Sequence, residues 1–199
     1  MVNIKINGRD IQADEGMTVL DAAKKASIKI PTLCHMDLEG LGFLNKDANC
    51  RVCMVEVMNW GNLVPACITK VSEGMDIRTD TTRVVNARRT NVELLLSNHP
   101  KDCLVCNRNG SCELQQLAIL THIDEIRYEG ERKEFEIDDS SLSIIRDPNK
   151  CVLCKRCLTM CNEVQTVGTL SDVDRGFDTV ISTAYGDPMP VSYTHLRAH

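Results

Sequence analysis

Four cysteines lie within eleven residues in the last third of the chain, and this run constrains the fold more than any other feature. Cys151, Cys154, Cys157 and Cys161 form a C-x2-C-x2-C-x3-C pattern, which is a spacing that holds 4Fe–4S clusters. Two residues between thiolates let one tight loop reach three corners of a cube. The x3 step then enters a helix that turns the fourth thiolate away, toward a neighbouring cluster. Zinc sites normally use two separated C-x2-C pairs, so the run predicts an iron–sulfur protein that carries electrons.

The composition restricts the compartment and the partners. The chain has eleven cysteines, and Met1–Asn7 alternates apolar and polar residues without the apolar core of a signal peptide. No apolar run approaches membrane-spanning length. We therefore expect a cytoplasmic protein that does not itself span a membrane, whose cysteines bind metal rather than form disulfides. The net charge of −5 and an aromatic content of 4% argue against nucleic-acid binding.

Residues 1–79 are predicted to form a small α+β domain. Gly8 is expected at a hairpin turn, and Thr18 is expected to cap a short helix. The strands are expected at Val2–Asn7, Asp10–Ala13, Met54–Met58, Leu63–Ile68 and Met75–Arg78. Two strands joined by a turn, then a helix, then a long loop is the element order of a β-grasp ferredoxin.

This domain contains four cysteines, enough to hold one 2Fe–2S cluster. They are Cys34, Cys50, Cys53 and Cys67. The close pair, Cys50 and Cys53, is expected to bind one iron or bridge its neighbourhood, and the distant pair completes the site. Fifteen residues separate Cys34 from Cys50, whereas a plant-type ferredoxin has about four at this point; a zinc site is the alternative. His35 is interpreted as a surface residue rather than a ligand, because adjacent side chains point apart.

Residues 80–140 are predicted to form a small helical domain that binds a 4Fe–4S cluster. Apolar residues recur at three- and four-residue steps over residues 80–98, which predicts a long helix. A second helix is expected over Cys112–His122. Between them lies an H-x3-C-x2-C-x5-C array made of His99, Cys103, Cys106 and Cys112. Three cysteines cannot saturate a cubane, so His99 is predicted to be the fourth ligand, and imidazole in place of thiolate should raise the cluster potential.

Other parts of these regions carry weaker expectations. Arg88 and Arg89 are expected to form a solvated or inter-domain face of the long helix. Residues 127–140 are expected to form a charged connecting loop with at most one short strand. Residues 141–190 are predicted to form an incomplete 4Fe–4S ferredoxin domain. In a two-cluster ferredoxin the fourth cysteine of each run binds the other cluster. The centre held by Cys151, Cys154 and Cys157 therefore lacks its fourth ligand, and Cys161 belongs to an adjacent 4Fe–4S centre.

Taken together, the three arrays resemble the N-terminal electron-transfer region of the FeFe hydrogenase catalytic subunit, especially its NAD-linked, electron-bifurcating type. The resemblance extends through Asn162–Gly168 and Arg175–Thr179. NAD-dependent formate dehydrogenase α subunits and complex I large subunits are similar, but complex I proteins usually lack a cysteine at the position of Cys161. The resemblance implies a β-grasp 2Fe–2S domain, a helical 4Fe–4S domain with one histidine and three cysteine ligands, and a truncated bacterial-ferredoxin-like 4Fe–4S domain.

The resemblance also implies a function, namely the iron–sulfur relay of an oxidoreductase. Electrons would pass between an NADH-oxidising flavin/iron–sulfur subunit, or ferredoxin, and a catalytic H-cluster domain missing from these residues. No catalytic residue is expected here, and no cofactor beyond the clusters. Residues 191–199, with His195 and His199, resemble translated adapter sequence and are expected to have no function. The alternatives are the relay of a formate dehydrogenase or complex I-type subunit, and a zinc-binding interaction protein without a redox role.

Overall fold

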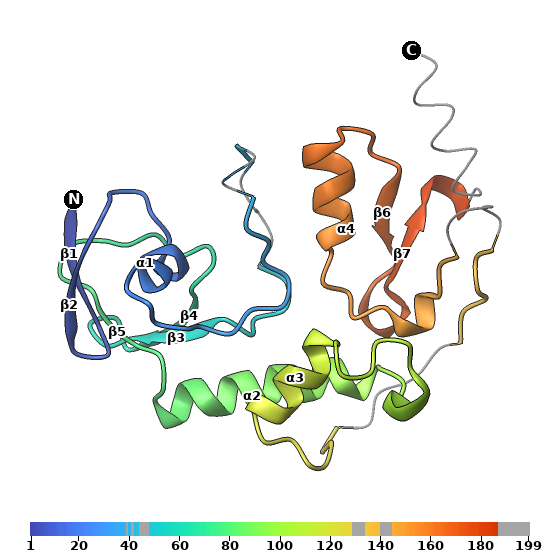
Figure 1. The fold of residues 1–199 in the computed structure, drawn as a ribbon, viewed down its shortest axis with the longest axis horizontal. Coiled ribbons are helices and arrows are strands. Elements are labelled where there is room, and N and C mark those ends of the chain that lie inside the picture. The colour runs from blue at the N-terminus through green and yellow to red at the C-terminus, as the bar shows by residue number, and fades with distance from the viewer. Residues whose placement is uncertain (39, 41, 44–47, 129–133, 140–144, 187–199) are drawn as a thin grey trace.

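The computed structural model describes the chain apart from residues 39, 41, 44–47, 129–133, 140–144 and 187–199. An N-terminal lobe and a C-terminal lobe stand side by side, and one long helix, α2, runs beneath both (Figure 1). The expected tail at residues 191–199 lies outside the described residues. None of the helices in the described ranges is long and apolar enough to cross a membrane.

The N-terminal lobe is a five-stranded sheet with one helix packed on it. Its strands are β1 (Val2–Ile6), β2 (Arg9–Ala13), β3 (Met54–Val57), β4 (Asn62–Pro65) and β5 (Asp76–Arg78), and its helix is α1 (Val19–Lys25). The order across the sheet is β2-β1-β5-β3-β4, and β1 pairs with β5 in parallel while the other pairs are antiparallel. This order around a single helix confirms the predicted β-grasp fold.

Local sequence signals explain the first elements of this lobe. Asn7 and Gly8 both have positive φ, 52° and 80°, as a two-residue hairpin turn that matches the strand twist requires. The Thr18 side chain accepts a hydrogen bond from the backbone N–H of Asp21 and so caps α1. The alternating residues Ile4 and Ile6 are buried against α1 in the core of the lobe. The predicted turn and helix cap are confirmed.

One predicted strand is too long. The strand expected over Leu63–Ile68 ends at Pro65, so Cys67 lies in the following turn rather than in the sheet. In this turn the carbonyl of Pro65 accepts hydrogen bonds from the backbone N–H groups of Ile68 and Thr69. The chain therefore curls back on itself after Pro65, and the Cys67 thiol is presented from a turn.

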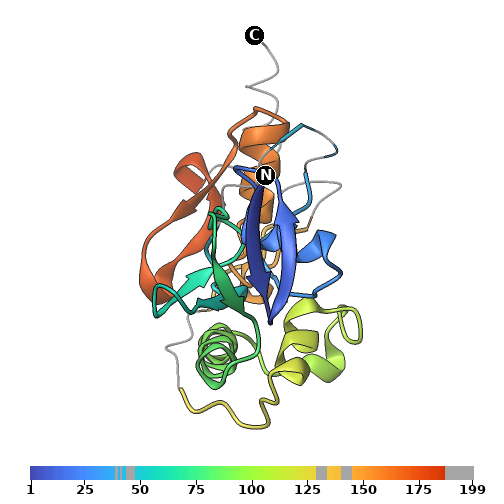
Figure 2. The ribbon, with the colours of Figure 1, turned by 90° about the vertical axis from the view of Figure 1, so that its left-hand side faces the viewer.

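Helices α2 (Thr82–Ser97) and α3 (Glu113–Leu120) form the base of the molecule. Figure 2 shows α2 nearly end-on beneath the sheet, with α3 beside it. Both predicted helices are confirmed, although Val85 and Ile119 face solvent instead of the expected apolar side. Glu93 of α2 is fully buried, and it pairs with Arg89 and with Arg127 beyond α3. The ion pair with Arg127 ties the segment after α3 back to α2.

The C-terminal lobe is made of short elements. They are the 3-10 turns η3 (Pro148–Lys150), η5 (Gly176–Asp178) and η6 (Ala184–Gly186), helix α4 (Arg156–Thr159), the π-helical turn η4 (Met160–Val164), and strands β6 (Leu170–Val173) and β7 (Val180–Thr183). The β6–β7 hairpin was not anticipated from the sequence. Before it, the described part of the connecting segment has one isolated bridge, between Asp138 and Arg146, consistent with the expected loop.

Candidate metal centres

The first candidate centre is a set of four buried thiols in the N-terminal lobe. Cys34, Cys50, Cys53 and Cys67 are all buried, and they form two hydrogen-bonded pairs. The hydrogen bond from Cys34 lowers the pKa of Cys50 to about 6 and raises the pKa of Cys34. The bond between Cys67 and Cys53 likewise lowers the pKa of Cys53 to about 7 and raises that of Cys67, which negative charge on Cys34 and Cys50 raises further. The four sulfurs therefore face one another.

This pairing differs from the expectation that the close pair, Cys50 and Cys53, binds one iron or bridges its neighbourhood. Strand β3 begins directly after Cys53, and the β3–β4 ladder continues through a hydrogen bond from the Ala66 N–H to the Cys53 carbonyl at 3.0 Å. The ladder therefore places Cys53 beside Cys67. Cys50, at the other end of the turn, lies beside Cys34 instead. Two pairs of thiols suit a two-iron cluster, in which each iron takes two of the four cysteine ligands.

Helix α2 holds the turn between Cys50 and Cys53. Arg51 in this turn has a left-handed backbone (φ 54°), a conformation that costs about 1–3 kcal/mol outside glycine and persists only when its surroundings enforce it. The Asn91 side chain donates to the Arg51 carbonyl at 2.7 Å, and the Arg88 guanidinium donates to the Met54 carbonyl at 2.7 and 3.0 Å. Arg88 thus makes an inter-domain contact, one of the two alternatives expected, while sequence reasoning missed Asn91.

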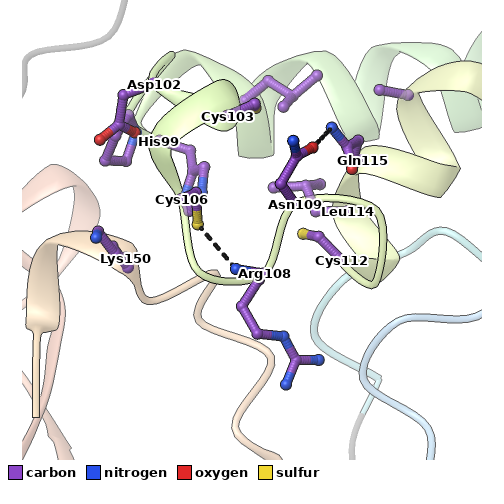
Figure 3. A pocket seen from close by; sticks show the side chains of 13 residues that line it. His99, Asp102, Cys103, Cys106, Arg108, Asn109, Cys112, Leu114, Gln115 and Lys150 are labelled. Carbon is purple, nitrogen blue, oxygen red and sulfur yellow. Dashed lines mark hydrogen bonds between the residues drawn. The ribbon is translucent and has the colours of Figure 1, made fainter.

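The second candidate centre is a cavity of about 90 Å³ at the far end of α2, well above the ~10–15 Å³ that one water molecule needs. All four residues of the predicted array line it, as Figure 3 shows: His99, Cys103, Cys106 and Cys112. Leu96 and Leu114 supply apolar walls. The donor set and the space both fit a cluster that is larger than a single ion.

The chain positions these four side chains by short, well-defined elements. His99 follows directly on the C-cap of α2, Cys103 opens the 3-10 turn η2 (Cys103–Val105), and Cys112 is the N-cap of α3. The Nδ1 atom of His99 is buried. The Cys106 sulfur accepts the backbone N–H of Arg108 at 3.5 Å, the kind of bond that tunes thiolate ligands of iron–sulfur clusters.

The third candidate centre is the run that begins at Cys151. Leu153 and Lys155 have left-handed backbones (φ 51° and 58°), which wrap the chain so that Cys151, Cys154 and Cys157 come close together. Burial raises the pKa values of Cys151 and Cys157, and negative charge on Cys154 raises both further. The Leu153 N–H donates to the Cys151 sulfur at 3.4 Å.

Cys161 has a different environment from the other cysteines of the run. It lies in η4, and its sulfur accepts the backbone N–H of Thr169 at 3.2 Å, next to the start of β6. The helical step after Cys157 therefore turns Cys161 toward the β6–β7 hairpin, as the x3 spacing indicates.

In the described part of the chain, no group of three or more His, Cys, Asp or Glu side chains is arranged to hold a single metal ion. Iron–sulfur clusters do not require such convergence, because different ligands bind different irons. His35, interpreted from the sequence as a surface residue, is half-buried. Burial lowers its pKa, although the negative charges of Asp21 and Asp37 oppose the shift.

The three centres share one hydrophobic cluster. Its buried members come from the first centre and from α2 and α3: Leu33, Cys34, Cys50, Val52, Val92, Leu114 and Leu117. Cys112 of the second centre and Val152 and Cys154 of the third pack against it. An ion pair between Arg156 and Glu113, 2.6 Å long, joins the third centre to the start of α3. A β-grasp domain with paired thiols and two further cysteine centres on a common core defines an iron–sulfur protein of the electron-transfer class.

Comparisons with known proteins agree with this class. Residues 1–82 match the family model of the 2Fe-2S iron-sulfur cluster binding domain, and residues 88–127 match the NADH-ubiquinone oxidoreductase-G iron-sulfur binding region. The chain therefore carries domains that bind 2Fe–2S and 4Fe–4S clusters, and both predicted cofactors are confirmed.

The chain is also similar to curated relatives and to a solved structure. The chain is 53% identical, over 93% of its length and 32% of the relative's, to NADP-reducing hydrogenase subunit HndD of Solidesulfovibrio fructosivorans. It is 34% identical, over 92% of its length and 26% of the relative's, to the NADH-ubiquinone oxidoreductase 75 kDa subunit of Reclinomonas americana. A chain in the crystal structure of NAD+-reducing [NiFe]-hydrogenase in the H2-reduced state matches with TM-score 0.83 and 25% identity, over 94% of this chain and 79% of that one.

These matches confirm the predicted resemblance to the iron–sulfur regions of hydrogenase and complex I subunits. The chain spans a third or less of the length of these two curated relatives.

Proposed function

We propose that the chain is the electron relay of an NAD(P)-linked FeFe hydrogenase subunit. The observation that carries the proposal is the shared hydrophobic cluster, which contains cysteines of the first centre and packs against cysteines of the other two. An apolar, closely packed medium between redox centres excludes water and holds the centres at fixed separations. An isolated zinc site would need no such common core.

The proposed ligands follow from the geometry of each centre. Cys34 with Cys50, and Cys53 with Cys67, would hold the two irons of a 2Fe–2S cluster. His99, Cys103, Cys106 and Cys112 would hold one 4Fe–4S cluster. Cys151, Cys154 and Cys157 would hold three corners of another, and Cys161 would serve an adjacent 4Fe–4S cluster. When bound, these groups supply one-electron storage, which is the redox chemistry of the relay.

The chain's own residues bind and orient the clusters and set their surroundings. Backbone N–H groups donate to cysteine sulfurs in the second and third centres, and hydrogen bonds of this kind influence cluster potentials. Leu114 and Val92 are fully buried and form part of the apolar core against which the centres pack. No acid–base or nucleophilic step is assigned to any residue in this proposal.

The partners are proposed from the relatives. The similarity to an NADP-reducing hydrogenase subunit supports an NADH-oxidising flavin/iron–sulfur subunit, or ferredoxin, as the electron donor or acceptor on one side. On the other side we propose a hydrogen-converting H-cluster domain. A complex I-type role is the second candidate, supported by the match to the 75 kDa subunit. Cys161 favours the hydrogenase, because the resembled complex I proteins usually lack a cysteine there.

Anaerobic reconstitution of the chain, followed by metal analysis and electron paramagnetic resonance (EPR), tests the relay. We expect about six firmly bound irons, from one 2Fe–2S and one 4Fe–4S cluster, plus a labile third centre. Reduction should produce two distinct paramagnetic signals. A colourless product loaded with zinc would refute the proposal. The reading frame downstream of residue 190 distinguishes the hydrogenase from the complex I-type alternative.

A further inference from the structure

Arg88 links helix α2 to the first centre. Its Nε and Nη2 atoms both donate to the carbonyl of Met54, at 3.0 and 2.7 Å. Met54 directly follows the proposed ligand Cys53, so this two-point contact fixes the half-buried guanidinium next to the 2Fe–2S centre. The contact crosses between regions, because α2 lies outside the β-grasp sheet.

The charges around Arg88 differ from those around the other cations of α2. Arg83 pairs with Glu56, and Arg89 pairs with Glu93. Among the residues that the structure describes, no carboxylate lies within ion-pair distance of Arg88, and the anionic groups that act on it are the Cys53 thiolate first and then Asp80. Burial lowers the pKa of this guanidinium, but arginine keeps its charge in proteins.

We propose that Arg88 is a positioning residue of the 2Fe–2S centre whose fixed positive charge raises the midpoint potential of that centre. This inference rests on the proposed ligation by Cys34, Cys50, Cys53 and Cys67. Reduction adds one electron to the centre, from the titrating reductant, and breaks no bond to the protein. The added negative charge is stabilised by a nearby cation, and partial burial weakens the solvent screening of that attraction.

A purely structural role for the same contact makes a different prediction. Two hydrogen bonds to a carbonyl would fasten α2 to β3 whatever their effect on the centre, as Asn91 does at Arg51. Loss of a purely structural contact lowers stability and cluster occupancy, whereas loss of the Arg88 charge shifts the midpoint potential of the 2Fe–2S centre. The two roles can therefore be separated in a protein that still assembles its cluster.

The test is an EPR-monitored redox titration of the reconstituted 199-residue chain and of three variants. We expect Arg88→Gln to lower the midpoint potential of the 2Fe–2S signal, and Arg88→Lys to restore it close to that of the parent chain. Arg83→Gln removes the same charge from the same helix. It is the matched control for the loss of one positive charge from α2 and should shift the potential less than Arg88→Gln does, because the hydrogen bonds of Arg83 go to Glu56 and to the Gly61 carbonyl and not to the first centre.

The second centre supplies an internal reference. His99 lies eleven residues beyond Arg88, about 16 Å along the helix axis, which is farther than the screening length of ~8–10 Å at moderate salt. Its signal should therefore keep its potential in Arg88→Gln. Equal shifts of both signals would point to a general change in the protein and would contradict the inference.

The remaining outcomes also test the inference. An intact 2Fe–2S signal at the parent potential in Arg88→Gln overturns the inference, as does a lowered potential in Arg88→Lys, which keeps the charge. If Arg88→Gln fails to assemble the centre while Arg83→Gln assembles it, the contact with the Met54 carbonyl is structural and the inference is overturned. Absence of a 2Fe–2S signal in the parent chain would refute the proposed ligation itself.

Discussion

The first and third centres both use a C-x2-C turn with a left-handed residue, but the chain supports the two turns very differently. The four thiols of the first centre are all buried inside a five-stranded sheet domain, whereas Cys157 of the third is exposed and its neighbours are half-buried. Elements of three to five residues surround the third centre. We therefore expect folding of the sheet to preorganise the first ligand set, and the third to depend more on a bound cluster for its order.

Replacing one thiol in each centre should break this comparison most strongly. Cys53→Ser removes a ligand from the buried pairs, and a serine hydroxyl does not replace a thiolate. We expect the 2Fe–2S signal and about two irons per chain to be lost. Cys157→Ser should leave both firmly bound clusters in place. Iron analysis with EPR measures both outcomes, and a 2Fe–2S signal that survives in Cys53→Ser would exclude this residue as a ligand.

Removing the iron should expose the difference in preorganisation. After chelation under anaerobic conditions, amides of β1–β5 should remain protected from hydrogen exchange because the core of the sheet stays buried. Amides of residues 103–112 and 151–161 should exchange with an opening free energy lower by about 3 kcal/mol or more. Uniform loss of protection over the whole chain would show that the sheet, too, depends on its cluster.

A substitution in the shared core tests how far the centres depend on one another. Leu114 of α3 is buried with 2% exposure, and Leu114→Ala should reduce the free energy of unfolding by about 2–5 kcal/mol. Leu120→Ala, on the same helix but 56% exposed, is the matched control and should stay within about 0.5 kcal/mol. Denaturant titration of the holo chain measures both. Similar values for the two variants would contradict the packing described for the common core.

Exchanging the proposed imidazole ligand tests the contrast between the second centre and the first, whose proposed ligands are all cysteines. His99→Cys should retain a 4Fe–4S cluster but lower its midpoint potential, because a thiolate adds one negative charge. The potential of the 2Fe–2S signal should not move. A redox titration reports both values in one sample. An unchanged 4Fe–4S potential would mean that His99 only ends the helix and does not bind iron.

The smallest effect is expected at Cys161, the last cysteine of the run in the third centre. The Cys161 sulfur accepts one backbone hydrogen bond, from Thr169, so Cys161→Ser should cost at most about 0.5–1.5 kcal/mol of stability. The iron content of the chain should not change, because the other ligands of its cluster are not among these residues. A drop of about four irons would show instead that the four cysteines of the run close around one cubane.

Much of the fold could be predicted because its signals are local. Alternation of apolar residues marked β1 and β2, and Thr18 marked the start of α1. The periodic apolar residues of α2 ended, as expected, before Pro100, since the helix stops at Ser97. The errors occurred where tertiary packing decides exposure. Val85 and Ile119 match the helical pattern yet face solvent, because the neighbouring elements cover only part of each helix.

The candidate ligands could likewise be predicted from the spacing of the cysteines, but which thiols pair with one another could not. A C-x2-C turn shows that two thiols can reach one cluster, and it does not show which distant thiol each one meets. That choice is made by the β3–β4 ladder, which sets Cys53 beside Cys67. The contact of Asn91 with the Arg51 carbonyl could not be predicted, since a polar residue on a helix surface is usually solvated, and for Arg88 the sequence left a solvated and an inter-domain face as alternatives.

The sequence by itself therefore determined the cofactors, the order of the centres and the β-grasp fold, since each follows from residues close together in the chain. Only the tertiary structure decided that Cys34 faces Cys50, that Arg88 lies beside Cys53 without a carboxylate partner in the described residues, and that three centres share one core. These features join residues far apart in the sequence. They exist only after the sheet, α2 and the C-terminal lobe have packed, because burial and charge depend on what surrounds a side chain.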